Sequence, residues 1–159
     1  MGKKRKESAA LYSDIRTFPH LNTLFQNQKL LALATQEPGN PYLSLMAFAM
    51  TEDLRSLIVA TQKGTRKYNN MVNSPGVSFL IDNRSSERDV FQQTMAVTGL
   101  GRAMEIEERD KEALMTLYLK KNPELEAFVR SPECALFKLV IDDLVVIDHF
   151  REAEEKGRP

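Results

Sequence analysis

The segment Leu57-Ile-Val-Ala-Thr-Gln-Lys-Gly-Thr-Arg-Lys67 decides the prediction of the fold, because an apolar run ends within it and a polar helix begins. The four apolar residues at its start favour a strand. Thr65 has a side chain suited to cap a helix N-terminus, which places Arg66 and Lys67 in the first helical turn. The helix is expected to end near Ser74-Pro75, so the segment predicts a strand followed closely by a short helix.

Arg66 and Lys67 lie at the end of the helix where cations are unfavourable. A helix N-terminus carries about half a positive charge, so each added cation costs roughly a few tenths of a kcal/mol. A bound anion would turn these unfavourable charge interactions into favourable ones. Free amides, hydroxyl groups and a guanidinium together suit a phosphate. The alternative is an ordinary solvated loop that carries Lys63, Arg66 and Lys67. This segment alone leaves both interpretations open.

Composition indicates one soluble globular domain. The chain has 159 residues, 42% apolar and 28% charged, and its 22 basic residues balance its 22 acidic ones. This balance gives no field that would favour a nucleic-acid partner. Cys134 is the only cysteine, which excludes an internal disulfide and a cysteine metal cluster and fits a small buried apolar residue. The two histidines, His20 and His149, are far apart in sequence, so no metal site is expected.

The ends of the chain are expected to be tails. The basic stretch Lys3 to Lys6 is not followed by an apolar stretch of signal-peptide length, and a solvated tail is favoured over a nucleic-acid patch. No apolar run is long enough to span a bilayer, so we expect no membrane partner. A single cysteine fits a reducing compartment, so we expect a cytoplasmic protein. We expect a flexible basic tail over 1–12, a single domain over 13–150 and a charged tail over 151–159.

Turn residues divide the rest of the chain into short elements. A first helix is expected over about 14–26, interrupted or restarted near Pro19, with Leu21, Leu24 and Phe25 as its apolar stripe. Gly99 and Gly101 indicate a bulge, a sharp corner or a close approach within their strand. Strands are expected at 29–35, 42–50, 56–61, 75–82 and 95–106, a helix within 107–129 that Pro123 ends or breaks, and a final hairpin of 135–141 and 144–148 around Asp142-Asp143. This order predicts a mainly β fold, a closed or split antiparallel β-barrel with peripheral α-helices.

The strand over 42–50 has two unlike faces. Its odd positions are uniformly apolar, whereas its even positions are mixed (Tyr42, Ser44, Met46 and Phe48). Such a pattern is expected of a barrel strand with one side toward a ligand or a subunit. A plain core strand explains the pattern equally well.

Three pieces of sequence between about Leu31 and Ala103 occur together in a distinctive order. They are Gly39-Asn-Pro-Tyr-Leu-Ser-Leu-Met-Ala-Phe48, then Ile58 to Lys67 followed by Asn73-Ser-Pro-Gly-Val-Ser-Phe79, and finally Val97-Thr-Gly-Leu-Gly-Arg-Ala103. Together they resemble the FMN-binding split barrel of the pyridoxamine 5′-phosphate oxidase-like family. The middle piece is the most specific, because residue types and spacing agree over about twenty positions.

The resemblance implies a cofactor site. The FMN phosphate would be held by Thr65, Arg66 and Lys67, and Ala60 and Thr61 would line the same site. The edge of the isoalloxazine ring would be passed by the main chain of Met46, Ala47 and Phe48. The resemblance also implies a homodimer, since related barrels bind FMN at a subunit interface.

The chain departs from the true oxidase at several positions. The oxidase has an Arg and a Lys where this chain has Leu45 and Met50, and the Trp-containing C-terminal signature is missing, since the chain has no Trp. We therefore expect FMN but not oxidation of pyridoxamine phosphate. The missing cations leave weaker FMN binding, or a deazaflavin in its place, as alternatives.

The expected function is an FMN-dependent oxidoreductase that acts on a small organic substrate, with a nicotinamide as a possible electron donor. No catalytic residue is assigned, because a flavin ring itself carries the electrons. The alternative is a non-catalytic protein on the same barrel that stores flavin, senses redox state or handles haem. Haem would need an axial ligand, and His149 is the only histidine in the barrel-forming region.

Overall fold

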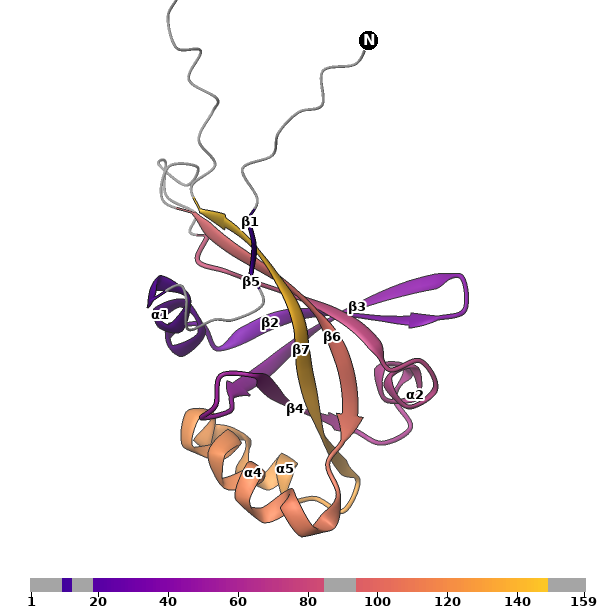
Figure 1. Cartoon of the computed structure of the whole chain (residues 1–159). Coiled ribbons are helices and arrows are strands. Elements are labelled where there is room, and N and C mark those ends of the chain that lie inside the picture. The colour runs from indigo at the N-terminus through magenta and orange to yellow at the C-terminus, as the bar shows by residue number, and fades with distance from the viewer. Residues whose placement is uncertain (1–9, 13–18, 85–93, 149–159) are drawn as a thin grey trace, which may run out of the picture.

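The computed structural model describes residues 10–12, 19–84 and 94–148, which are mainly β-strands (Figure 1). The strands are β1 (Ala10–Tyr12), β2 (Leu30–Glu37), β3 (Asn40–Met50), β4 (Ser56–Gln62), β5 (Gly76–Asp82), β6 (Met95–Glu105) and β7 (Cys134–Asp148). The helices are α1 (Pro19–Asn27), α2 (Arg66–Asn73), α4 (Glu108–Lys121) and α5 (Glu126–Val129), with a 3₁₀ turn, η2, at Pro123–Leu125.

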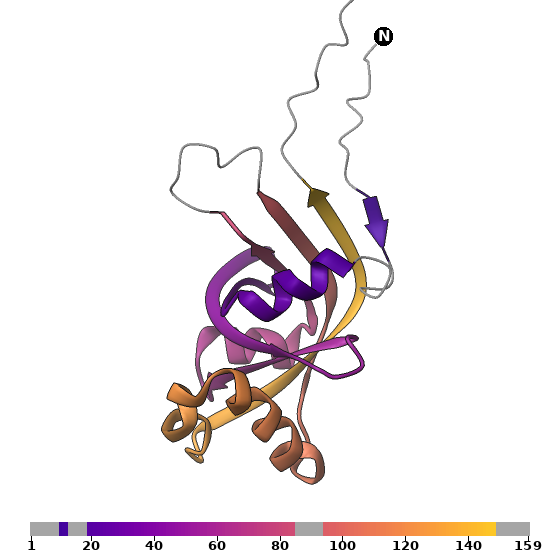
Figure 2. The same ribbon diagram turned by 90° about the vertical axis from the view of Figure 1, so that its left-hand side faces the viewer.

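The strands form an antiparallel barrel. Its order is β7-β4-β3-β2-β5-β6, and pairing of β6 with β7 closes the ring. β1 adds to the outer edge of β7. Figure 2 shows α1 lying across the side of the barrel, whereas α4 and α5 gather at one end. The predicted mainly β fold, a split antiparallel barrel with peripheral helices, is confirmed.

The barrel is split between β3 and β4. Residues 48–50 pair with 57–59. In the described sheet, the rest of β3 pairs with β2 alone, and the last residues of β4 pair with β7 alone. A gap in the ladder therefore separates the part of β3 that carries Met46 from the end of β4 that carries Thr61. The chain enters α2 from this end of β4.

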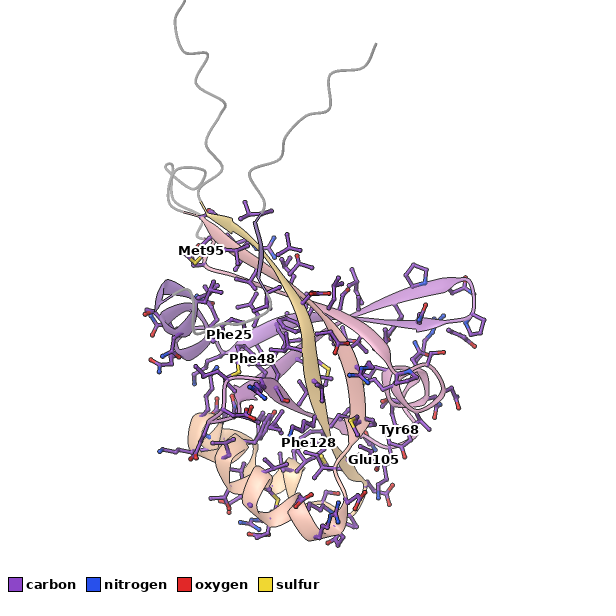
Figure 3. All side chains as sticks on the ribbon, in the orientation of Figure 1. Phe25, Phe48, Tyr68, Met95, Glu105 and Phe128 are labelled. Carbon is purple, nitrogen blue, oxygen red and sulfur yellow. The ribbon has the colours of Figure 1, made fainter. Side chains whose placement is uncertain are left out.

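Aromatic side chains join α1 to the barrel interior. The ring centroid of Phe25 lies 6.3 Å from that of Phe48 and 6.5 Å from that of Phe79, both with edge-to-face geometry. Figure 3 shows Phe25 and Phe48 close together beneath α1. Leu21, Leu24 and Phe25, on the predicted apolar stripe of this helix, are all buried. This stripe therefore seals one side of the core.

β4 is buried on both of its faces. Leu57 and Val59 face the barrel core, whereas Ile58 and Ala60 pack beneath the outer layer that includes Tyr118 of α4. This double burial explains why the strand reads as a continuous apolar run rather than an alternating one. The same burial raises the pKa of the Tyr118 phenol well above its usual value.

The two glycines of β6 mark close approaches, as predicted. A Cβ at Gly99 would overlap the ring of Phe79, and a Cβ at Gly101 would overlap the main-chain oxygen of Val140. The register with β7 shifts between Leu100 and Gly101, which is the expected bulge.

The predicted final hairpin is wrong, because residues 134–148 form the single strand β7. Asp142 and Asp143, which suggested a turn, lie within this strand. β6 pairs with β7 over nearly its whole length and keeps it extended. Arg102 donates hydrogen bonds of 3.2 and 3.1 Å to the two carboxylate oxygens of Asp142, so this acid is tolerated in the strand.

Two predictions about the start of the chain fall partly outside the described residues. α1 begins at Pro19, and residues 14–18 of the predicted helix are not described. Proline suits a first helical position, where its missing N–H would be unpaired anyway. β1 lies inside the segment 1–12 expected as a tail and pairs with residues 144–146 of β7. His149 and the expected C-terminal tail lie outside the described residues.

Candidate functional site

The site begins where β4 passes into α2 through a tight turn. Gly64 has a φ of 77°, a conformation that favours glycine. Thr65 is the N-cap, as predicted, with φ −70° and ψ 158°. The main-chain N–H of Tyr68 donates to Thr65 Oγ1 over 3.4 Å, and that of Asn69 donates to the Thr65 carbonyl over 3.0 Å.

Hydroxyl groups and free amides meet at this helix start. Thr61 Oγ1 lies 3.2 Å from Thr65 Oγ1, and Thr65 Oγ1 donates to the Gln62 carbonyl over 2.8 Å. Residues in the first helical turn have no carbonyl one turn earlier to receive their N–H groups. Among the hydrogen bonds of the described residues, none uses the main-chain N–H of Arg66 or Lys67. These two amides are therefore available to an anion.

The basic side chains near the turn differ in their availability. Arg66 Nη2 lies 3.3 Å from Glu37 Oε2, and its guanidinium carbon lies 4.9 Å from the centroid of the Tyr42 ring. Lys63 Nζ donates to the Pro132 carbonyl over 3.1 Å. Within the described part of the chain, Lys67 makes no ion pair. Lys67 is thus the side chain most ready to receive an anion, whereas Arg66 is already paired.

Polar contacts fix α2 to the barrel on its inner side. Asn70 is buried, and its Nδ2 donates to Thr35 Oγ1 over 3.1 Å. The Tyr68 hydroxyl donates to Glu105 Oε2 over 3.2 Å, and these two labelled side chains meet in Figure 3. The Tyr68 ring contacts that of Phe137 edge-on at 5.7 Å. Burial and the nearby Glu105 carboxylate raise the pKa of Tyr68. Tyr68 therefore has a packing role.

The β3 residues expected near the cofactor ring show their main chain rather than their side chains to the split. The side chains of Met46 and Phe48 are buried in the barrel core. Ala47 is half-buried against the outer cluster, which also contains Ala60. The Phe48 carbonyl already accepts a bond of 3.2 Å from Asn122 Nδ2. Of these three residues, only Met46 and Ala47 thus lie on the unpaired part of β3, where their main chain borders the split.

Ser44 carries a buried hydroxyl group without a partner. Among the described side chains, its Oγ is the only fully buried polar atom that lacks a hydrogen bond within the protein. Native proteins leave few such groups unpaired, so each needs an explanation. Ser44 lies on the part of β3 that has no pairing with β4, two residues before Met46. A polar ligand in the split would be a suitable partner.

Lys121 is a half-buried cation beside the site rather than within it. Its Nζ lies 3.7 Å from the centroid of the Phe48 ring and donates to the Phe25 carbonyl over 2.7 Å. Burial lowers the pKa of Lys121 to about 8. This lysine holds the end of α4 against α1, since the Phe25 carbonyl lies in the last turn of α1.

The structure brings together most of the residues predicted to form the site. Thr61, Thr65 and the first turn of α2 share one corner, and Met46, Ala47 and Ala60 lie on strands that border the split. Sequence reasoning missed Glu37, which pairs with Arg66 from the β2–β3 hairpin. It also missed Tyr42, Asn70 and Glu105. Asn70 alone gave a signal, as a poor helix former inside a helix, but its partner is 35 residues away.

Two kinds of site are not found. In the ranges that the structure describes, no three His, Cys, Asp or Glu side chains are grouped to hold a metal ion. No described helix is long and apolar enough to cross a membrane.

The sequence matches the family described as Pyridoxamine 5′-phosphate oxidase over residues 18–143. The match covers most of the chain, and the chain therefore belongs to this family. Among curated proteins, none matches the chain.

Solved structures share the fold at low sequence identity. A protein of unknown function from Agrobacterium tumefaciens has a TM-score of 0.72 and 18% identity, over 82% of this chain and 57% of its own. A heme binding protein from Mycobacterium smegmatis has a TM-score of 0.72 and 17% identity, over 80% of this chain and 52% of its own. A FAD-binding protein from Mesorhizobium loti has a TM-score of 0.66 and 16% identity, over 88% of this chain and 97% of its own. The chain thus spans little more than half of the first two proteins, and these likenesses show the fold alone.

Proposed function

We propose that this protein is a flavoprotein that binds FMN and holds its phosphate at the start of α2. The observation that carries the proposal is the convergence of two hydroxyl groups, on Thr61 and Thr65, with the unpaired amides and basic side chains of Arg66 and Lys67. An anion there would satisfy the amides and offset the unfavourable position of the two cations. Membership of the family supports FMN over other anions.

The residues of the split fit the rest of the cofactor. The main chain of Met46 and Ala47 would run along the ring, and the unpaired Ser44 hydroxyl would gain a polar partner. FMN would supply the transfer of electrons or hydride, while the protein binds and orients it. The true oxidase has cations at two positions where this chain has apolar residues. These are Leu45, which is 70% exposed, and Met50, which is half-buried and packs against the core. We therefore propose an oxidoreductase with a small organic substrate other than pyridoxamine phosphate.

We also propose that the protein is a homodimer. Leu43 and Leu45 on the outside of β3 are each 70% exposed, and Leu100 on β6 is 44% exposed. The registers Leu43↔Ala34, Ala34↔Ser78 and Ser78↔Leu100 place Leu43 and Leu100 in one row across the outer sheet. Exposed apolar groups on one face favour a protein partner, and a second copy agrees with the family. Replacing Leu43 and Leu45 with Asp should yield monomers in light scattering, whereas Val72→Asp, at another exposed apolar site, should leave the dimer intact.

We propose a cytoplasmic location, because a chain with a single cysteine suits a reducing compartment.

The function is tested by the absorption of the purified protein and by titration with flavins. A yellow sample supports a bound flavin. An apoprotein that binds FMN more tightly than riboflavin supports a phosphate-binding site. Anaerobic addition of NADH or NADPH should bleach the flavin if a nicotinamide is the donor. A colourless protein that takes up no FMN would contradict the proposal.

A second candidate, haem binding without catalysis, is favoured by the likeness to the heme binding protein from Mycobacterium smegmatis. It predicts a Soret band in place of flavin absorption.

A further inference from the structure

The β2–β3 hairpin places the Glu37 carboxylate beside Arg66, the arginine of the proposed phosphate-binding site. Glu37 is the last residue of β2, opposite Asn40, and Gly39 makes the tight turn between them with a φ of 79°. Glu37 Oε2 lies 3.3 Å from Arg66 Nη2. The hairpin and the start of α2 are 29 residues apart in sequence, so only the fold brings this pair together.

Tyr42 helps to hold the arginine at the hairpin. Its ring lies beneath the Arg66 guanidinium at 4.9 Å, on the strand that follows the turn. A guanidinium has five donors and stacks on aromatic faces. The ion pair with Glu37 uses one of these donors, at 3.3 Å, which is longer than a typical charge-assisted bond. Arg66 thus retains most of its capacity for an anion with a better geometry.

We propose that Glu37 tunes the affinity of the cofactor site: it neutralises Arg66 in the empty protein and is exchanged for the phosphate of the cofactor. This inference rests on the proposed function. The phosphate of FMN carries about two negative charges at neutral pH and accepts a bidentate contact from arginine. The Glu37 carboxylate carries one charge and is 58% exposed, so water readily solvates it after release. Binding of FMN therefore requires this exchange, whereas binding of riboflavin, which has no phosphate, does not.

The exchange has a measurable cost, because FMN must first displace Glu37. Exposed ion pairs contribute little, and on that scale Glu37→Gln should tighten FMN binding by about two- to fivefold. Riboflavin has no group that competes for Arg66, so its affinity should not change. Glu37 is exposed, and the variant should fold normally.

The experiment is a double-mutant cycle on the full chain, read by flavin fluorescence titration with FMN and with riboflavin. Its variants are Glu37→Gln, Arg66→Met and the pair of substitutions together. Glu133→Gln is the matched control, because the Glu133 main-chain oxygen accepts the N–H of Lys63 over 2.8 Å at the same turn while its carboxylate is not the ion-pair partner of Arg66. The cycle separates exchange at Arg66 from general repulsion of the phosphate by nearby acids.

Exchange predicts a gain in FMN affinity for Glu37→Gln that disappears in the Arg66→Met background and is absent in Glu133→Gln. A gain that persists without Arg66, or that Glu133→Gln reproduces, would show through-space repulsion and overturn the inference. Unchanged FMN affinity in Glu37→Gln would also overturn it while leaving the proposed function intact. Failure of the unaltered protein to bind FMN would refute the proposed function itself.

Discussion

Removing both cations from the start of α2 should weaken FMN binding strongly. Each charge-assisted hydrogen bond contributes about 1.5 to 3 kcal/mol. Arg66 first gives up its exposed pair with Glu37, worth about 0.2 to 1 kcal/mol, so its net share is smaller than that of Lys67. The variant Arg66→Met with Lys67→Met should therefore lose about 2 to 5 kcal/mol. This corresponds to a rise in Kd of roughly 30-fold to several thousand-fold.

Fluorescence titration of the apoprotein with FMN and riboflavin measures this loss. Riboflavin lacks the phosphate, so the double variant should bind it as well as the unaltered protein does. A matched control removes Arg109 and Lys120, two exposed cations on α4, and changes the net charge by the same amount. This control should bind FMN normally at moderate ionic strength, since exposed charges at a distance are screened.

Two results would refute the reasoning. Equal FMN affinity in the double variant and the unaltered protein would place the phosphate elsewhere. An equal loss for FMN and riboflavin would show that the substitutions disturb the fold of the split rather than a phosphate contact. Far-ultraviolet circular dichroism of each variant separates this second case from simple unfolding.

Three further predictions concern stability and reactivity. Gly101→Ala should lower the free energy of unfolding by about 1 to 3 kcal/mol in urea denaturation. This loss should exceed that of Gly99→Ala, because the added Cβ at position 101 meets main chain on β7, whereas the one at position 99 meets a ring that can shift. Equal losses for the two variants would contradict this. Cys134 should react with a thiol reagent only in denaturant, since burial raises its pKa, and prompt labelling of the native protein would count against burial. The pKa of Lys121 is about 8 in the folded protein, below the ordinary lysine value of 10.5 that the unfolded chain regains, so the unfolded chain binds more protons between these two values. The free energy of unfolding should consequently rise with pH from about 8 to 10.5, and this rise should vanish in Lys121→Met.

The local pattern of the chain determined the elements of the barrel and one corner of the site. Strand ends, turns and the N-cap at Thr65 depend on neighbouring residues, so they could be read within one or two positions. The cations at Arg66 and Lys67 could be recognised as misplaced for the same reason. The prediction at Asp142-Asp143 was wrong, because a long partner strand and the cation of Arg102 overrode a local turn preference.

Only the tertiary structure decided what the rest of the site contains. The split between β3 and β4, the unpaired hydroxyl of Ser44 and the pair of Glu37 with Arg66 all depend on strands meeting across the barrel. A sequence specifies hydrogen-bond and charge partners locally when they lie within a turn of each other. Partners tens of residues apart are set by register and closure of the sheet, which are collective properties of the whole barrel.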